Sequence, residues 1–465
     1  MLTKLEADGF KNLLDFSTYF GPYTCIAGPN AAGKSNIFDA IEFLSLLSDN
    51  TFMEAALKLR SVGNVGSDPR ALFWDDGTTD LPTMRLAAEM ILPSVVEDDF
   101  GRQDKPTTTF VRYEIVLQHR KGDDSNRIHA GRIVLLKEEL THIKLGEAAH
   151  HLPWPHSKKY FRDGVVRGRR SGTAFISTTV ENGEGVVNVH QDGGSRGQPR
   201  KSPAQRAPRT VISTTTTSDD PTILAARREM QQWRTLSLEP SAMRAPDMMT
   251  DPAVLAPNGA HMASTLFRLA NEFGDDIYSA VSSASSALTD VRGVTVDHDM
   301  QRDLLTLQAA LGDGPYLPAR ALSDGTLRFL ALCIVGADPE YTGVLCMEEP
   351  ENGIHPGRIG SMVDLMRELA VDPNEAPGTE NPLLQVLVNT HSPHFVQLQN
   401  RDDLLLAVPT TVRRSGRICT TIRLLPLADS WRAKADVPSV SLQTIVDYLE
   451  RPAGAQLTLD MAVAG

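Results

Sequence analysis

Eight consecutive residues of this sequence have the types and the spacing of a phosphate-binding loop. Residues 28–35 read Gly-Pro-Asn-Ala-Ala-Gly-Lys-Ser, which fits the pattern G-x-x-x-x-G-K-[ST]. In such a loop, backbone N–H groups and the N-terminus of the following helix point at an anion. Lys34 would place its charge on the terminal phosphates, and the Ser35 hydroxyl would help to hold Mg²⁺. The loop therefore predicts a nucleoside triphosphate and Mg²⁺ as ligands.

Two flanking segments supply the structure that this loop requires. Tyr23–Ala27 is a short run typical of a buried strand. Asn36–Leu47 has apolar residues at helical spacing, with Ile37, Ile41 and Leu44 on one face. A loop that uses its glycines only to turn is the alternative. The strand on one side and the helix on the other disfavour it.

A second apolar run, Gly343–Met347, ends in two consecutive carboxylates, Glu348 and Glu349. Because side chains alternate along a strand, we expect Glu348 to face a metal ion and Glu349 to face an attacking water. The alternative is an ordinary strand end with surface acids. A phosphate-binding loop in the same chain favours the catalytic interpretation.

Two polar turns could complete a nucleotide site. Residues 323–326 read Ser-Asp-Gly-Thr and open an apolar helix at 327–335, so they offer N–H groups and a hydroxyl to an anion. This turn has no lysine and would be a weak phosphate site alone. His391 follows a buried strand at 383–388, where it would reach the same crevice as the acidic strand. A single histidine there is more often structural, but here it coincides with the other signals.

The amino-acid composition limits the classes of protein to which this chain can belong. The chain has 465 residues and a formal net charge of -12, so any DNA contact must come from a local patch rather than from a general positive charge. The four cysteines show no C-x-x-C spacing, which fits a reducing compartment and argues against a zinc hook. Charged residues near the N-terminus argue against a secretory signal, and no run approaches ~18 apolar residues. We expect a cytoplasmic protein without a membrane span.

The remaining pattern predicts an α/β protein in three parts. Stretches rich in Thr, Val, Tyr and Ile predict strands in the first part, and helical patterns alternate with strands in the last. We expect an N-terminal unit at 1–90, an inserted β-rich region at 91–240 and a C-terminal unit at 241–465. The expected strands are 2–7, 13–16, 84–92, 107–117, 132–143, 291–296, 304–311, 404–408 and 418–425, and further expected helices are 223–238, 263–287, 359–369 and 441–449.

The segment 150–217 differs from the rest of the chain. Between residues 158 and 209 it holds 11 Lys or Arg against 4 Asp or Glu, with Gly, Ser, Pro and Thr between them. So few apolar residues do not offset the entropy cost of ordering, and we expect a mobile or partner-ordered insertion. A solvated loop and a contact with nucleic-acid phosphates remain equally open. His150, His151 and His156 cluster nearby, but without cysteines or helical spacing a metal site is the less favoured interpretation.

Together these residues resemble the ABC-type ATPases of the RecF, SMC and OLD group. The resemblance is greatest with the stand-alone ATPase branch found in bacterial DNA-maintenance and anti-phage systems, and it covers residues 1–50 and about 240–400. It implies a P-loop head of ABC type, with mixed sheets, an inserted β-rich region and a helical signature lobe. Residues 28–35 would be the Walker A loop, 322–326 the signature and 351–355 the D-loop region.

The resemblance also assigns roles to single residues. Glu349 would be the catalytic glutamate and His391 the switch histidine, and Gln118 is a candidate for the Q-loop glutamine. The metal-side acid is Glu348 where the family more often has Asp, and the signature reads Ser-Asp-Gly-Thr rather than Ser-Gly-Gly-Gln. The implied contacts are Gly28, Asn30, Gly33, Lys34, Ser35 and Asn36 with ATP, Ser35 and Glu348 with Mg²⁺, and Ser323, Asp324 and Gly325 with the ATP of a second subunit.

In the resembling family the signature and the Walker A loop meet across a dimer. The resemblance therefore implies an ATP-gated homodimer or higher homo-oligomer that hydrolyses ATP in a DNA-maintenance or anti-phage complex, with DNA and a separate effector such as a nuclease as partners. No convincing Toprim acidic set follows His391, so the chain does not resemble a self-contained OLD nuclease. A nucleotide-dependent assembly scaffold is the main alternative. A transporter nucleotide-binding subunit is disfavoured by the long inserted β region.

Overall fold

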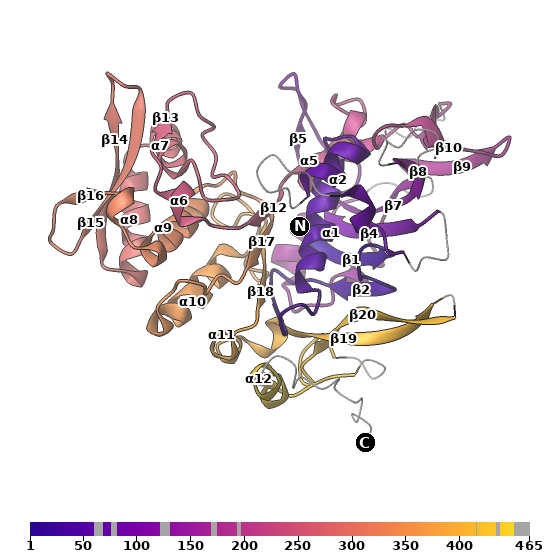
Figure 1. Cartoon of the computed structure of the whole chain (residues 1–465). Coiled ribbons are helices and arrows are strands. Elements are labelled where there is room, and N and C mark those ends of the chain that lie inside the picture. Colours follow the sequence, from indigo (N-terminus) through magenta and orange to yellow (C-terminus); the bar gives the residue numbers. More distant parts are fainter. Residues whose placement is uncertain are drawn as a thin grey trace.

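The computed structural model describes residues 1–59, 68–75, 81–120, 131–168, 174–192, 197–414, 416–433 and 438–450. Its elements form two bodies that lie side by side in Figure 1. The larger body holds a six-stranded and an eight-stranded sheet, and the smaller lobe, on the left, holds a four-stranded sheet with helices. Within the described ranges, no helix combines the length and the apolar character that a bilayer crossing requires.

A six-stranded sheet in the larger body carries the phosphate-binding loop. In spatial order its strands are β12 (Trp233–Leu236), β17 (Gly343–Glu348), β18 (Leu384–Thr390), β3 (Tyr23–Ala27), β19 (Leu404–Arg414) and β20 (Arg417–Pro426). All strands except β20 run parallel, and β3 and β18 are buried along their whole length, as in a sheet covered on both faces. Ala27 pairs with Thr390, and Asn389 pairs with Glu348. The carboxyl ends of β3, β18 and β17 therefore meet at one edge.

An eight-stranded antiparallel sheet forms the other layer of the larger body. In spatial order its strands are β11 (Arg200–Pro203), β10 (Glu184–Val189), β9 (Ile176–Glu181), β8 (Arg132–His142), β7 (Phe110–Arg120), β4 (Thr83–Ile91), β1 (Leu2–Asp8) and β2 (Phe16–Tyr19). One face buries apolar residues such as Leu86 and Ile115, and the other carries ion pairs among Glu6, Arg112 and Glu114. Strands from both sides of the boundary predicted at residue 90 belong to this sheet. The domain boundaries at residues 90 and 240 stay predictions.

Helices cover both faces of the six-stranded sheet. Those between the two sheets bury the apolar face predicted for residues 36–47, including Ile37 and Ile41. Those on the opposite face pack in a second core (Figure 1). The inner helices are α1 (Lys34–Leu47) and α5 (Pro221–Gln231), the outer ones are α10 (Ile359–Leu369) and α11 (Pro393–Gln397), and α2 (Phe52–Lys58) and α12 (Leu442–Glu450) lie at the periphery.

The smaller lobe contains the helix that begins at the Ser323 turn. Residues 263–287 are mostly helical, as expected, and Gly274, with φ 93°, separates two helices there. The antiparallel strands at 291–299 and 304–311 agree with the prediction. The elements of this lobe are α6 (Pro240–Met243), β13 (Asp247–Met248), α7 (Met262–Phe273), α8 (Asp276–Leu288), β14 (Val291–Asp299), β15 (Leu304–Leu311), β16 (Tyr316–Pro318) and α9 (Asp324–Ala337).

The described part of segment 150–217 is folded, so the expectation of a mobile insertion is wrong for it. The segment adds β9, β10 and β11 to the eight-stranded sheet, and its large apolar side chains Trp154, Phe161 and Phe175 are buried. It needs no core of its own because it extends an existing sheet. The short elements of the chain are η1 (Pro69–Leu72), β5 (Val96–Glu97), β6 (Gln103–Asp104), α3 (Ala148–His151), the π-helix η2 (Lys158–Arg162), α4 (Asp163–Val165), η3 (Ala204–Arg206), η4 (Ile212–Thr214), η5 (Ala319–Ala321), η6 (Pro356–Arg358) and η7 (Arg401–Asp403).

Two further predictions of local structure are wrong. The strand expected at 13–16 lies instead at β2, because Lys11 (φ 47°) and Asp15 (φ 50°) turn the backbone out of the extended conformation. The helix expected at 223–238 ends at Gln231, and the next residues form β12 beside β17. A short apolar segment fits either a helix or a strand, and here pairing with β17 decides.

Candidate functional site

The phosphate-binding loop joins β3 to α1 at the edge where three parallel strands end. The backbone N–H of Gly28 donates to the Thr390 carbonyl at 3.1 Å, which ties the loop to β18. A Cβ at position 28 would lie 2.8 Å from the carbonyl oxygen of Ala407, so the loop approaches β19 too closely for a larger residue. The strand before the loop and the helix after it agree with the sequence prediction.

Lys34 stands in the first turn of α1 and is 6% exposed. Its Nζ donates to the carbonyls of Gly28 and Pro29 at 2.6 and 2.8 Å, so the side chain folds back across its own loop. Burial lowers the pKa of Lys34, and three nearby glutamates oppose this effect. Lys34 is therefore the central cation of a compact site that also contains three acidic side chains.

The N-terminus of α1 is held by Asn12, a residue that the sequence analysis did not single out. Gly33 has φ 97°, in the left-handed region that favours glycine, and a Cβ there would lie 2.3 Å from Nδ2 of Asn12. Oδ1 of Asn12 accepts a hydrogen bond from Nδ2 of Asn36 at 2.8 Å. Asn36, expected to contact ATP, thus points to Asn12, while Asn30 is exposed at the loop.

Glu348 and Glu349 follow each other across a turn of the backbone. Glu348 is the last residue of β17, whereas Glu349 has φ 46°, a value uncommon outside glycine. The backbone N–H of Glu349 donates to the Asn389 carbonyl at 2.9 Å, which holds this conformation. The directions of the two carboxylates are therefore set by this turn and not by strand alternation, on which the prediction was based.

Glu349 and His391 form a direct pair. Nδ1 of His391 lies 2.7 Å from Oε1 of Glu349, and Nδ2 of Asn352 donates to Oε2 of the same carboxylate at 2.8 Å. The two partners come from the ends of neighbouring strands, β17 and β18. An imidazole and a carboxylate in this arrangement can orient a water molecule and accept its proton.

Ser35 and Glu348 are the side chains that could hold Mg²⁺. Ser35 is the second residue of α1 and Glu348 ends β17, so the hydroxyl and the carboxylate come from the same edge of the sheet. Mg²⁺ prefers oxygen ligands and is usually bound through one or two protein groups together with substrate phosphates. The donor set fits the ion.

The Ser323 turn lies in the smaller lobe and opens α9. Ser323 is exposed, and its Oγ accepts a hydrogen bond from the backbone N–H of Thr326 at 3.2 Å, which caps the helix. Arg244 forms an ion pair with Asp324 and donates to the Leu322 carbonyl at 3.1 Å. These contacts hold the turn while its outer side stays open to solvent.

A surface pocket of about 590 Å³ opens beside this turn. Its lining joins residues 323–326 to residues 353–355, which belong to the D-loop region expected at 351–355. A Cβ at Gly325 would lie 3.6 Å from Cδ1 of Ile354, so the two segments are in van der Waals contact range. This surface belongs to the smaller-lobe side of the molecule, whereas α1 lies between the sheets of the larger body (Figure 1).

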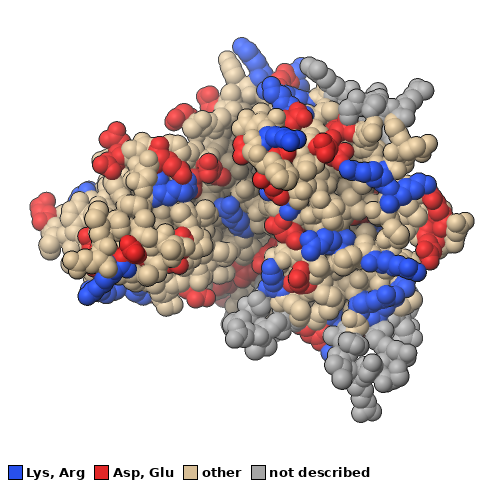
Figure 2. Space-filling model, turned by 90° about the horizontal axis from the view of Figure 1, so that it is seen from above, with Lys and Arg blue, Asp and Glu red and all other residues tan. Residues whose placement is uncertain are grey.

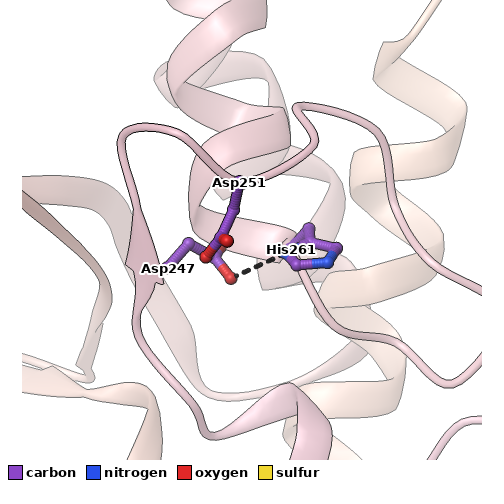
Figure 3. Close-up of side chains that lie close together, drawn as sticks. All are labelled: Asp247, Asp251 and His261. Carbon is purple, nitrogen blue, oxygen red and sulfur yellow. Dashed lines mark hydrogen bonds and ion pairs between the residues drawn. The ribbon is translucent and has the colours of Figure 1, made fainter.

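A further cluster of metal-ligand type lies in the smaller lobe. The ligand atoms of Asp247, Asp251 and His261 are within 4.8 Å of one another (Figure 3). Asp247 accepts a hydrogen bond from the backbone N–H of Ser264 at 3.0 Å and pairs with Nδ1 of His261 at 3.1 Å. Its carboxylate therefore caps the N-terminus of α7, and we assign the cluster this structural role.

The other candidates from the sequence lie apart from the site. Nδ1 of His151 pairs with Glu89 at 2.7 Å, whereas Nδ1 of His156 donates to the Trp154 carbonyl at 2.7 Å, and His150 is exposed. These histidines do not form a metal-ligand cluster within the described residues.

Gln118, the Q-loop candidate, lies on β7 of the eight-stranded sheet. Its Oε1 accepts a hydrogen bond from Nε of Arg120 at 3.0 Å. It follows Leu117, which points into the core, and so Gln118 lies on the opposite, solvent-facing side of that sheet. This position is on the far side of the core from α1, and we do not assign Gln118 to the candidate site.

Comparison with known proteins adds a family match. Residues 233–397 match a family described as "AAA domain, putative AbiEii toxin, Type IV TA system". None of the curated proteins matches this sequence at a significant level. The matched residues include the Ser323 turn, both acids at the end of β17, and His391.

The chain also resembles solved structures of SMC head domains at low identity. An SMC head bound to the C-terminal winged-helix domain of ScpA is 14% identical, with a TM-score of 0.48, over 92% of this chain and 98% of that chain. An SMC head with an extended coiled coil, bound to the C-terminal domain of ScpA derived from Pyrococcus furiosus, is 12% identical, with a TM-score of 0.44 over 91% and 96%. The SMC head domain from Thermotoga maritima is 11% identical, with a TM-score of 0.36 over 92% and 99%.

Proposed function

We propose that this chain is a P-loop ATPase of the ABC and SMC type, which binds ATP with Mg²⁺ and hydrolyses it as a cytoplasmic subunit of a bacterial DNA-maintenance or anti-phage complex. One observation carries the proposal. Lys34, Glu348, Glu349 and His391 lie at the ends of three adjacent parallel strands, or in the helix that follows one of them. Hydrolysis of a triphosphate requires these groups together: a cation for the phosphates, a metal ligand, and a base for the water.

Each group has a distinct role in the proposed reaction. Glu349 orients the attacking water and accepts its proton as the water oxygen bonds to the γ-phosphorus and the bond to ADP breaks. His391, held by Glu349, contacts the γ-phosphate. Lys34 turns from the loop carbonyls toward the phosphates, since both are oxygen acceptors. Ser35 and Glu348 would hold Mg²⁺, which offsets negative charge on the phosphate oxygens.

A second subunit completes the site in this proposal. The Ser323 turn is exposed and offers a hydroxyl and a helix N-terminus, but it has no lysine of its own. We propose that Ser323, Asp324 and Gly325 of one subunit cover the nucleotide held by Lys34 of another. ATP would then shift the equilibrium toward the homodimer, because only that state uses these contacts.

Glu349→Gln tests the base and the dimer together. The variant should bind ATP, hydrolyse it at least about 100-fold more slowly than wild type, and accumulate as a dimer with ATP. Steady-state phosphate release and light scattering measure these outcomes. Glu340→Gln, the same exchange at an exposed glutamate, is the matched control and should change neither.

The oligomeric state of the wild-type protein decides what a negative result means. If wild type is monomeric and Glu349→Gln stays monomeric at saturating ATP, the composite site is wrong. If wild type is already an oligomer without nucleotide, ATP acts by gating contacts within that assembly instead of by creating it.

DNA is the proposed partner outside the nucleotide site. Lys158 and Lys159 are exposed on η2, whereas Lys201 pairs with Glu181 at 2.6 Å. In Figure 2, basic side chains are spread over the larger body and are interspersed with acidic ones. The exposed lysines of η2 are adjacent in the chain and, with the exposed Arg167 and Arg206, are the described basic residues of segment 150–217 that we propose to meet DNA phosphates.

Charge reversal tests this contact. Duplex DNA should stimulate the wild-type ATPase, and the stimulation should fade steeply with salt, because phosphate contacts release counterions. A protein with both Lys158→Glu and Lys159→Glu should lose most of the stimulation, whereas Lys105→Glu, at another exposed lysine, should keep it. Indifference to DNA, together with tight co-purification of a partner protein, would favour an assembly scaffold. A co-purifying nuclease would identify the proposed effector.

A further inference from the structure

Glu351 is the most enclosed of the three glutamates at the nucleotide site, with 8% of its surface exposed. The hydroxyl of Thr390, at the end of β18, donates to its Oε1. Its Oε2 is buried and has no hydrogen-bond partner within the described residues. If the carboxyl were ionised, this oxygen would be a buried charge-bearing atom without a donor, an arrangement that proteins avoid.

The surroundings of Glu351 also disfavour a charge on it. Four titratable groups on adjacent elements interact with it electrostatically: Lys34 of α1, Cys25 of β3, Glu349 after β17 and His391 after β18. Three glutamates compete for the single lysine of this group. Burial raises the pKa of Glu351, and repulsion by Glu349 adds to the effect, which together outweigh the local hydrogen bonds and the influence of His391.

Thr390 connects Glu351 to the turn that carries His391. Oγ1 of Thr390 accepts a hydrogen bond from the backbone N–H of Ser392 at 2.9 Å. Oγ of Ser392 in turn accepts from the N–H of Phe395 at 3.3 Å and caps α11. His391 lies between these two anchored residues, so the Thr390 hydroxyl helps to fix the backbone from which the His391 ring reaches Glu349.

We propose that Glu351 is a positioning residue for ATP hydrolysis, and that it acts as a neutral carboxylic acid that holds the Thr390 hydroxyl. The inference rests on the proposed function, because it concerns the same site. Neutrality has a second consequence there. An ionised Glu351 would oppose the charge of Lys34 and repel the triphosphate, whereas the neutral acid leaves the lysine charge available to the phosphates.

Three variants separate a neutral positioning group from a charged one. Glu351→Gln keeps the size of the side chain without a charge, and its kcat should stay within about 3-fold of wild type. Glu351→Ala and Thr390→Val each remove the contact, and each should lower kcat by about 10- to 100-fold with little change in the KM for ATP. The Ala/Val double variant should be no slower than the slower single variant, since one contact is lost in all three.

Either of two kinetic results would overturn the inference. A folded Glu351→Gln protein, with the circular dichroism of wild type and a cooperative thermal transition, that is as slow as Glu351→Ala would show that the charged form is needed. Additive losses in the Ala/Val double variant would show that Glu351 and Thr390 act separately.

A measurement without nucleotide separates this inference from the proposed function. A carboxylic acid whose pKa is raised in the folded state makes its full contribution to the stability of the fold below its ordinary pKa of 4.5. This contribution is lost as the pH rises through the pKa of the folded state. The melting temperature of Glu351→Gln relative to wild type should therefore increase from about pH 4 to about pH 8. If wild type hydrolyses no ATP, the proposed function fails, but this difference still reports on Glu351. A constant difference across that range would refute a neutral Glu351.

Discussion

Several side chains of this protein have ionisable groups that are buried, where a charge is energetically costly. Lys34, Glu351 and Glu138 are each less than a tenth exposed. Burial moves the pKa of each group in the direction that favours its neutral form. Two of them, Lys34 and Glu351, belong to the proposed nucleotide site. Glu138 lies in the core of the larger body, where it joins β8 to the residues around η4.

The contacts of Glu138 lead to a prediction about pH. Its carboxyl accepts hydrogen bonds from the backbone N–H groups of Val211 and Ile212 at 2.7 and 3.0 Å, and from the Tyr113 hydroxyl at 3.2 Å. Burial nevertheless raises the pKa of Glu138 to about 7. The stability that the protonated carboxyl contributes is fully present below pH 4.5 and is lost as the pH rises to about 7. Over that window the free energy of unfolding should therefore fall by up to about 3 kcal/mol.

Glu138→Gln provides the check by urea denaturation at several pH values. The amide NH₂ would face a backbone N–H donor, which should cost about 1–3 kcal/mol at low pH, and this deficit should shrink as pH rises because only wild type loses stability. Glu139→Gln, at the next position of β8, should show neither effect. A deficit that stays constant between about pH 5 and about pH 8 would contradict the prediction.

At the level of elements, β18 connects the parts of the site. It lies between the strand that leads into the phosphate-binding loop and the strand that ends in the acids. It is also joined to the other sheet through Gln385, which is fully buried. The Gln385 amide accepts from the N–H of Leu2 at 2.9 Å and donates to the carbonyls of Leu2 and Gly21 at 2.8 Å each. One side chain thus satisfies three buried backbone groups.

Gln385→Leu should therefore destabilise the protein strongly. The substitution leaves three backbone groups unpaired in the core, and we expect a loss of about 3 kcal/mol in the free energy of unfolding. Chemical denaturation measures the loss, and Gln301→Leu, at an exposed position in the β14–β15 turn, should cost little. A loss below about 1 kcal/mol for Gln385→Leu would mean that the backbone groups find other partners.

For the whole molecule, the main consequence of the fold is that the two halves of the proposed site lie in different bodies. The phosphate-binding loop is in the larger body and the exposed Ser323 turn is in the smaller lobe (Figure 1). Arg244 and Thr326 hold the turn with its outer side in solvent. This arrangement suits contact with a second copy, in which each chain supplies a different half of each site.

Mixing two inactive variants tests that arrangement. Lys34→Ala removes the cation of the phosphate-binding loop, and Ser323→Arg blocks the exposed Ser323 turn. Neither variant should therefore hydrolyse ATP alone. After subunit exchange, the mixture should regain activity, because one site of each heterodimer combines an intact loop with an intact signature. Mixing Ser323→Arg with a chain that carries both substitutions is the control and should stay inactive. No recovery despite proven exchange would place the whole site within one chain.

The sequence by itself determined the parts of this protein that depend on near neighbours in the chain. The phosphate-binding loop follows from the spacing within residues 28–35, and the strand before it and the helix after it follow from local periodicity. The acids after Gly343–Met347 and the histidine after β18 could be placed at strand ends for the same reason. Their roles in catalysis stay a prediction, as do the boundaries of the units.

Tertiary structure alone decided the features that depend on residues far apart in the sequence. Asn12 meets Gly33 only because the two sheets pack together, and Thr390 meets Glu351 only because β17 and β18 pair. The fold of segment 150–217 and the strand β12 likewise depend on neighbours supplied by other parts of the chain. Local propensity contains no information about such partners, because the free energy of these contacts arises only when the sheets have assembled.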